Sequence, residues 1–134
     1  MAIVENEKIE FKTVYKEFLG ALRLVQEERQ DYENGVLSLH EYLINALRSL
    51  ELSRGLLVLF KDQFIKVLDE NKNFGLFRDA QECYDFLLNT IIEAINRISK
   101  ILEKKSKKDI RELYDLLNSL DFWLEKFFFP DYKS

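Results

Sequence analysis

The sequence predicts an all-α protein, an up-and-down antiparallel bundle of four to five helices. Apolar residues recur three, four or seven positions apart along most of the chain, which is the spacing of helices that bury one face. No segment alternates apolar and polar residues as a half-buried strand does. The chain has one proline, Pro130, and four glycines, so little interrupts long helices. Short turns between such helices favour an antiparallel bundle.

Length and composition indicate one domain that spans residues 1–134. A chain of this size buries roughly two thirds of its surface on folding, and 47% hydrophobic residues place it far from the composition of disordered chains. The longest apolar run, Leu56 to Phe60, is much shorter than the ~20 residues of a membrane-spanning helix. A single cysteine and an N-terminus unlike a signal peptide lead us to expect a cytoplasmic protein.

The first two helical segments lie in the N-terminal half. The first is expected from Ile9 to about Tyr32, and the dipeptide Asn34-Gly35 ends it. The second extends from Leu37 to about Glu70 and contains Gly55, which costs about 1 kcal/mol relative to alanine inside a helix. We therefore expect either a kink at Gly55 or a division into two helices, and the sequence leaves both open.

The last two helices follow a polar turn at residues 70–75. The third helix is expected to carry a buried stripe that begins at Leu76 and includes Cys83. The final helix is expected from about Lys108 until shortly before Pro130, which a helix interior does not accommodate.

Catalytic chemistry is weakly indicated. Proton transfer and nucleophilic attack need a base beside a nucleophile. The only histidine, His40, is expected at the surface or near a helix cap, and the only cysteine, Cys83, falls on a buried stripe. No phosphate-binding loop, dinucleotide fingerprint, zinc motif or calcium loop occurs. An HEPN-type ribonuclease site needs an arginine about four to six residues before its histidine, and this motif is missing because the nearest arginine before His40 is Arg29. We therefore expect neither an enzyme nor a bound metal or cofactor.

The second segment has more apolar residues than one buried face requires. At about 100° per residue, its main stripe leaves further apolar side chains toward the opposite side, namely Ile44 and Val58 and, less squarely, Leu52 and Leu59. A helix that is apolar on two sides is either central in its bundle or covered by a partner. The three consecutive phenylalanines at residues 127–129 also exceed what one helix face buries. At least one of these rings is expected to pack across a helix end or to meet a partner.

A basic segment, residues 97–111, joins the third helix to the last. Lysines at the end of a helix complement its dipole, so a solvated helix end explains the segment. Binding to phosphates or to an acidic partner is the alternative, although the net charge of −4 disfavours nucleic-acid binding by the protein as a whole. The candidate residues of this patch are Lys100, Lys104, Lys105, Lys107, Lys108 and Arg111.

A series of residues between positions 68 and 94 falls at the spacing of a known pattern. They are Leu68, Asp69, Lys72, Tyr84, Asp85, Phe86, Ile91, Ile92, Glu93 and Ala94. In these positions the chain resembles the flagellar secretion chaperone family FliS. The resemblance spans residues 18 to 123, with insertions after Leu50 and after Ala94, and Asn73-Phe74 replaces a glycine pair of the family.

The resemblance implies a non-enzymatic export chaperone that binds the C-terminal part of flagellin and prevents premature polymerisation. A disordered apolar segment would fold as a helix into a groove of the bundle. From helical geometry, the candidate groove residues are Ile44, Leu52, Val58, Leu59, Phe86 and Ile92. The expected partner is a flagellin-like client or another helical protein segment. The alternative is a small helical subunit of a nucleoprotein assembly that uses residues 97–111.

Overall fold

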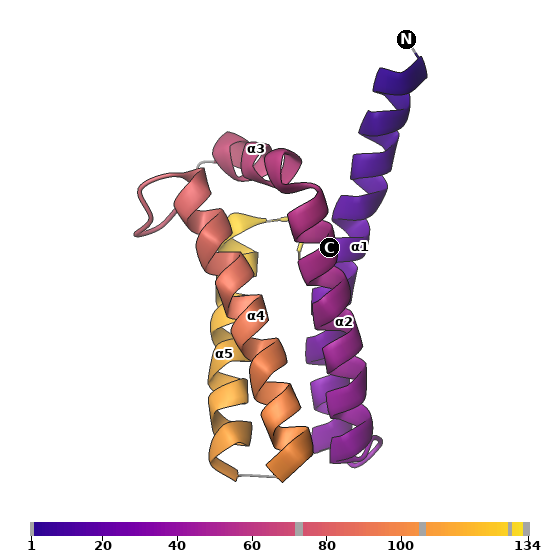
Figure 1. Ribbon diagram of the computed structural model, residues 1–134, viewed down its shortest axis with the longest axis vertical. Helices are drawn as coiled ribbons and strands as arrows, with labels where there is room; N and C mark the ends of the chain where they lie inside the picture. Colours follow the sequence, from indigo (N-terminus) through magenta and orange to yellow (C-terminus); the bar gives the residue numbers. More distant parts are fainter. Residues whose placement is uncertain (1, 72–73, 105–106, 129, 133–134) are drawn as a thin grey trace.

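The chain folds into five α-helices, four of which form an antiparallel bundle (Figure 1). The computed structural model describes residues 2–71, 74–104, 107–128 and 130–132, with side chains from residue 10 onward. No strand occurs in these ranges, so the predicted all-α bundle of four to five helices is confirmed. The helices are α1 (Ala2–Glu33), α2 (Leu39–Leu59), α3 (Lys61–Asn71), α4 (Ala80–Lys104) and α5 (Lys107–Phe127).

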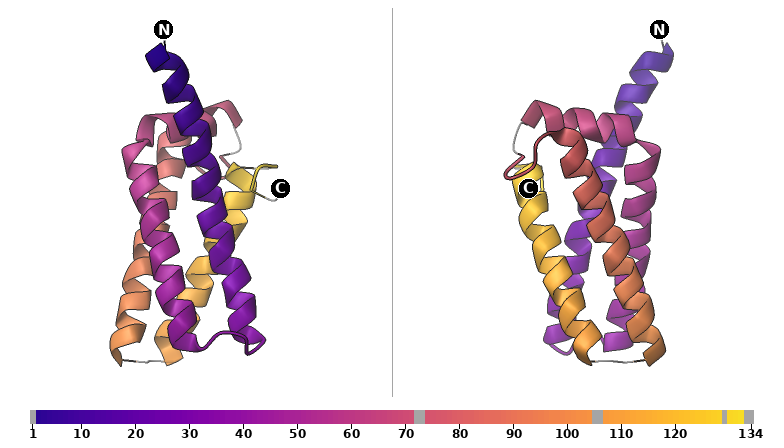
Figure 2. Two further views of the ribbon diagram at one scale, coloured as in Figure 1. Left: turned by 90° about the vertical axis from the view of Figure 1, so that its right-hand side faces the viewer. Right: turned by 60° about the vertical axis from the view of Figure 1, so that its left-hand side comes forward.

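The four long helices run in alternating directions, and α3 crosses one end of the bundle (Figure 1). α1 packs along α2, α4 along α5, and α2 along α4. α1 and α5 are joined by side chains, because the Gln26 amide donates to the Leu117 carbonyl at 3.0 Å and the Arg29 guanidinium donates to Asn118 Oδ1 at 2.7 Å. α1 begins earlier than the predicted Ile9, and Figure 2 shows its first turns projecting past α3. Within the described ranges, no helix is both long and apolar enough to cross a membrane.

Side-chain caps set the starts of α2 and α4. Ser38 Oγ accepts from the Glu41 N–H at 3.1 Å, and the Glu41 carboxylate accepts from the Ser38 N–H at 3.1 Å, which is a capping box before α2. The Asp79 carboxylate accepts from the Glu82 N–H at 2.9 Å and so caps α4. Leu76 therefore precedes the helix and is 94% exposed, and its predicted place in the buried stripe is wrong.

The segment from 37 to 70 forms two helices, and the break lies at Phe60 rather than at Gly55. Phe60 leaves the helical conformation, with φ −113° and ψ 35°. Its ring centroid lies 6.2 Å from that of Phe11, and the next turn buries Phe64 completely. Gly55 stays helical, with nothing within 4 Å of a Cβ built on it. Packing of the phenylalanines, and not the low helix propensity of glycine, thus determines where the chain turns.

The core follows the predicted apolar stripes, and Cys83 is fully buried within it. Phe127 is the last residue of α5, and its side chain is buried in the core. Phe128 lies just after the helix end, and its ring centroid is 5.9 Å from that of the buried Phe18. The prediction that one ring of this run packs across a helix end is confirmed at Phe128, while Phe129 lies outside the described residues.

Candidate functional site

The outward side of α2 carries three exposed apolar residues, which we call the α2 apolar face. Leu52, Val58 and Leu59 are 48%, 53% and 77% exposed. At about 100° per residue, Leu52 and Leu59 lie opposite the buried Leu50 and Leu57. α1 and α4 pack against α2, and their packing leaves these three side chains exposed. Of the two explanations for the surplus apolar residues, a fully central α2 is therefore excluded.

Gly55 lies on the same side of α2, between Leu52 and Leu59 along the helix. Open space surrounds the position of its missing Cβ, since no atom comes within 4 Å. The backbone is therefore bare between two exposed leucines. This arrangement suits an apolar side chain of a partner helix, which would fit between the leucines and contact the backbone closely.

Tyr84 of α4 holds the corner at which the α2 apolar face ends. The last carbonyls of α2 lose their helical partners because the chain turns at Phe60. The buried Tyr84 hydroxyl donates to one of them, the Leu57 carbonyl, at 2.9 Å. The Lys61 ammonium lies 5.5 Å from the centroid of the tyrosine ring. Burial raises the pKa of Tyr84, so the hydroxyl remains a donor. A residue of the family pattern thus fixes the geometry of the α2–α3 corner.

The other predicted groove residues lie elsewhere along the helices. The Phe86 ring centroid is 5.0 Å from that of Phe77 and 5.9 Å from that of Trp123, so Phe86 faces α5. Ile44 is half-buried near the start of α2, and Ile92 is half-buried in the middle of α4. Only the α2 apolar face therefore gathers several strongly exposed residues of the predicted groove on one helix side.

The basic segment lies at the end of the bundle opposite α3 (Figure 1). Arg97 is engaged there by Asp109, at 3.3 Å, and by Glu112. Lys105 lies outside the described residues. The remaining cations are exposed and have no ion-pair partner within the described ranges: Lys100, Lys104, Lys107, Lys108 and Arg111.

Cys83 and His40 do not form a catalytic pair. Cys83 lies in the first turn of α4, whereas His40 is exposed and lines a shallow pocket with Ile101 and Leu102 at the other end of that helix. Burial raises the pKa of the Cys83 thiol to about 11, so the thiol is protonated at neutral pH and is a poor nucleophile. Within the described part of the chain, no group of three or more His, Cys, Asp and Glu side chains could hold a metal ion.

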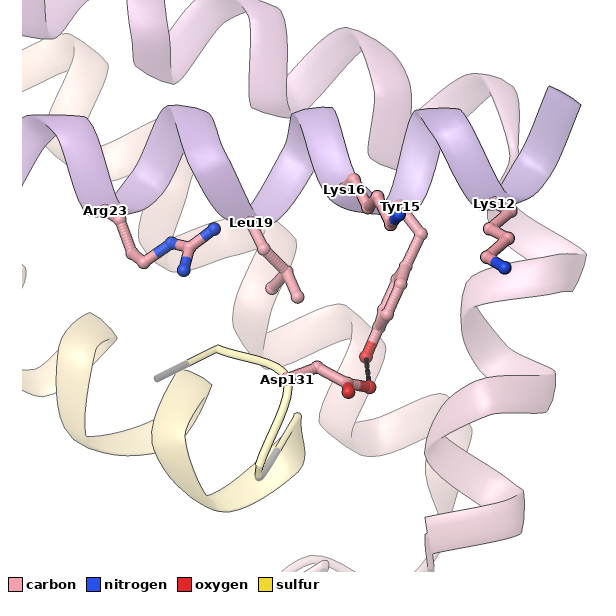
Figure 3. Close-up of a pocket in the computed structure, with 6 residues that line it drawn as sticks. All are labelled: Lys12, Tyr15, Lys16, Leu19, Arg23 and Asp131. Atoms are coloured by element: carbon pink, nitrogen blue, oxygen red, sulfur yellow. Dashed lines mark hydrogen bonds between the residues drawn. The ribbon is translucent and has the colours of Figure 1, made fainter. Parts of the chain in front are cut away.

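A groove that the sequence did not predict lies between α1 and the turn that follows α5 (Figure 3). Its volume is about 450 Å³. The hydroxyl of Tyr15 donates to Asp131 Oδ2 at 2.9 Å across it. The described lining residues are Lys12, Tyr15, Lys16, Leu19, Arg23 and Asp131.

Comparisons with known proteins do not extend this description. No protein-family model matches the chain, and searches of curated proteins and of solved structures gave no match. The fold and surface define the class of protein, an all-α bundle with a fifth helix across one end and an exposed apolar face on α2.

Proposed function

We propose that this protein is a non-enzymatic, cytoplasmic export chaperone. In this proposal the α2 apolar face binds a disordered, helix-forming segment of flagellin or of a similar client and prevents its premature polymerisation. The main observation in support is the exposure of Leu52, Val58 and Leu59 around the bare backbone of Gly55. Single apolar residues on a protein surface are ordinary, but three on the outward side of one helix form a surface that a partner would cover.

The energetics set how far the client must extend. Because half to three quarters of each side chain is exposed, covering Leu52, Val58 and Leu59 contributes roughly 3–5 kcal/mol in total. Ordering a disordered segment costs about 2–5 kcal/mol. The α2 apolar face alone therefore only offsets the ordering cost. The client would gain net affinity by also covering the half-buried Ile44 or Ile92, which belong to the predicted groove.

The resemblance to the FliS family supports the class of client. Tyr84, a residue of that pattern, anchors the corner beside the proposed site through Leu57. Binding of this kind needs shape and apolar area and no catalytic group, which agrees with the buried, protonated thiol of Cys83.

The proposal is tested by affinity capture from the source organism, with mass spectrometry of the bound proteins. The wild type should capture flagellin, and Leu59→Asp should lose it because a charge would then lie inside the interface. Leu76→Asp is the matched control, since Leu76 is an exposed leucine outside α2, and it should still capture flagellin. Equal capture by Leu59→Asp and the wild type would contradict the proposed site.

The basic patch supports a second candidate function, a small helical subunit of a nucleoprotein assembly. The observation behind it is the group of exposed cations at the α4–α5 end that have no ion-pair partner within the described ranges. Binding to single-stranded RNA should then weaken steeply as salt rises, and combined charge reversal at Lys104, Lys107 and Lys108 should abolish it. Capture of RNA with other helical subunits, lost in this variant but not in Leu59→Asp, would replace the chaperone proposal.

A further inference from the structure

We infer that the groove between α1 and the C-terminal turn binds an acidic segment of a partner protein. The carboxylates of that segment would meet three cations of α1, and an apolar side chain would occupy the cavity. α2 and α5 flank different sides of α1, so this site is separate from the α2 apolar face and does not rest on the proposed export function.

Three cations line the groove from one side of α1. Lys12, Lys16 and Arg23 follow one another at intervals of four and seven residues, which is the spacing of one helix face. None has an ion-pair partner among the described residues. Like charges four residues apart disfavour a helix, and here they are concentrated in a protein whose net charge is −4. This face is therefore electrostatically complementary to an acidic partner.

The opposite wall of the groove is the C-terminal turn, which is held in place. Tyr132 is buried, and its hydroxyl donates to Asp121 Oδ1 of α5 at 2.5 Å. Its N–H donates to the Phe128 carbonyl at 2.9 Å. Asp131 supplies the one carboxylate among the described lining residues, so three cations against one anion leave a lining charge of +2. The wall narrows the groove without neutralising it.

The floor of the groove is apolar. Leu19 is buried, and the ring of Tyr15 packs with its centroid 5.8 Å from that of Phe128. Figure 3 shows Leu19 and Arg23 directed from α1 toward the side on which Asp131 lies. A volume of about 450 Å³ is sufficient for a large apolar side chain.

The spacing of the cations favours a peptide over a phosphate group. Lys12 and Arg23 are separated by about 16 Å along the helix axis. Tight recognition of a phosphate needs donors that converge on one point. Cations spread over three turns instead suit carboxylates carried by separate residues of one segment, with an apolar residue between them.

The test is calorimetric titration of the full-length protein with a synthetic helical peptide built from glutamate and leucine. The wild type should bind this peptide more weakly as salt rises, and Lys12→Gln/Lys16→Gln should weaken binding about tenfold. Arg48→Gln/Lys66→Gln is the matched control, since it changes the net charge equally at exposed cations of α2 and α3 that do not line the groove, and it should change the affinity less than about twofold. Circular dichroism of both variants checks that they fold.

Four results would overturn the inference. They are the absence of peptide binding by the wild type, equal weakening by the two double variants, equal binding of a peptide with glutamine in place of glutamate, and displacement of the peptide by inorganic phosphate at comparable concentration. The last result would assign the groove to phosphate ligands instead.

Discussion

Replacing Tyr84 by phenylalanine tests how the α2–α3 corner is held. The Tyr84 hydroxyl is buried and donates to the Leu57 carbonyl at 2.9 Å, where α2 has no backbone donor to offer. Phenylalanine keeps the ring and its packing but leaves this carbonyl unpaired. A buried polar group without a partner costs about 1–3 kcal/mol, and in a domain of 134 residues each kcal/mol lowers Tm by roughly 3–5 °C. We therefore expect Tyr84→Phe to lose about 1–3 kcal/mol of unfolding free energy.

Urea unfolding followed by circular dichroism measures this loss. Tyr114→Phe is the matched control: the Tyr114 ring lies 4.0 Å from the Arg29 guanidinium carbon, a contact that phenylalanine retains, and its hydroxyl has no hydrogen-bond partner among the described residues. The control should stay within about 0.5 kcal/mol of the wild type. If Tyr84→Phe were as stable as the control, the hydrogen bond to Leu57 would not hold the corner.

Three further predictions concern other parts of the molecule. Gly55→Ala should stabilise the protein by about 0.5–1 kcal/mol, because a Cβ there meets no atom within 4 Å, and it should weaken client binding. Gly20→Ala, in equally open surroundings on α1, should stabilise the protein without changing its affinity for the client. Equal client affinity for the two variants would contradict the role of Gly55 in binding. Urea unfolding between pH 7 and 11 should show full stability near neutrality and a decline above about pH 9, since burial raises the folded-state pKa of Cys83 from 9.0 to about 11 and raises those of Tyr42 and Tyr132 above 10.0. As pH rises, the unfolded chain releases these protons before the folded protein does, so the unfolding free energy falls by up to about 1.4 kcal/mol per pH unit for each group. A urea midpoint that stays constant up to pH 11 would refute the raised pKa values of these buried groups. Tyr42→Phe should preserve stability or raise it by up to about 1 kcal/mol, because the buried Tyr42 hydroxyl has no hydrogen-bond partner in the described ranges; a loss in urea unfolding would mean that the hydroxyl is satisfied.

The helices were predictable because their packing faces repeat along the sequence. This periodicity did not locate two helix boundaries, the break between α2 and α3 and the start of α4. The break at Phe60 arises from contacts with Phe11 and the core, which are distant in sequence. The start of α4 was visible in principle, because Asp79 followed three residues later by Glu82 is a helix-cap signal. Periodicity alone instead extended the helix to the exposed Leu76.

The candidate site was predictable only where it depends on one helix. Leu52 and Leu59 face outward for reasons of helical angle, and they are exposed. Phe86 instead packs with Trp123 of α5, a contact that no local pattern contains. The spacing of Lys12, Lys16 and Arg23 on α1 was likewise present in the sequence. The wall of the groove opposite them contains Asp131, and only the fold brings it there.

The most direct test of the proposed function is calorimetric titration of the purified protein with the C-terminal segment of flagellin from the same organism, with circular dichroism of the complex. We predict saturable binding and a gain of helix, both lost in Leu59→Asp and retained in Leu76→Asp. Absence of binding by the wild type, or binding of equal affinity by Leu59→Asp, would contradict the proposal that the α2 apolar face receives this client.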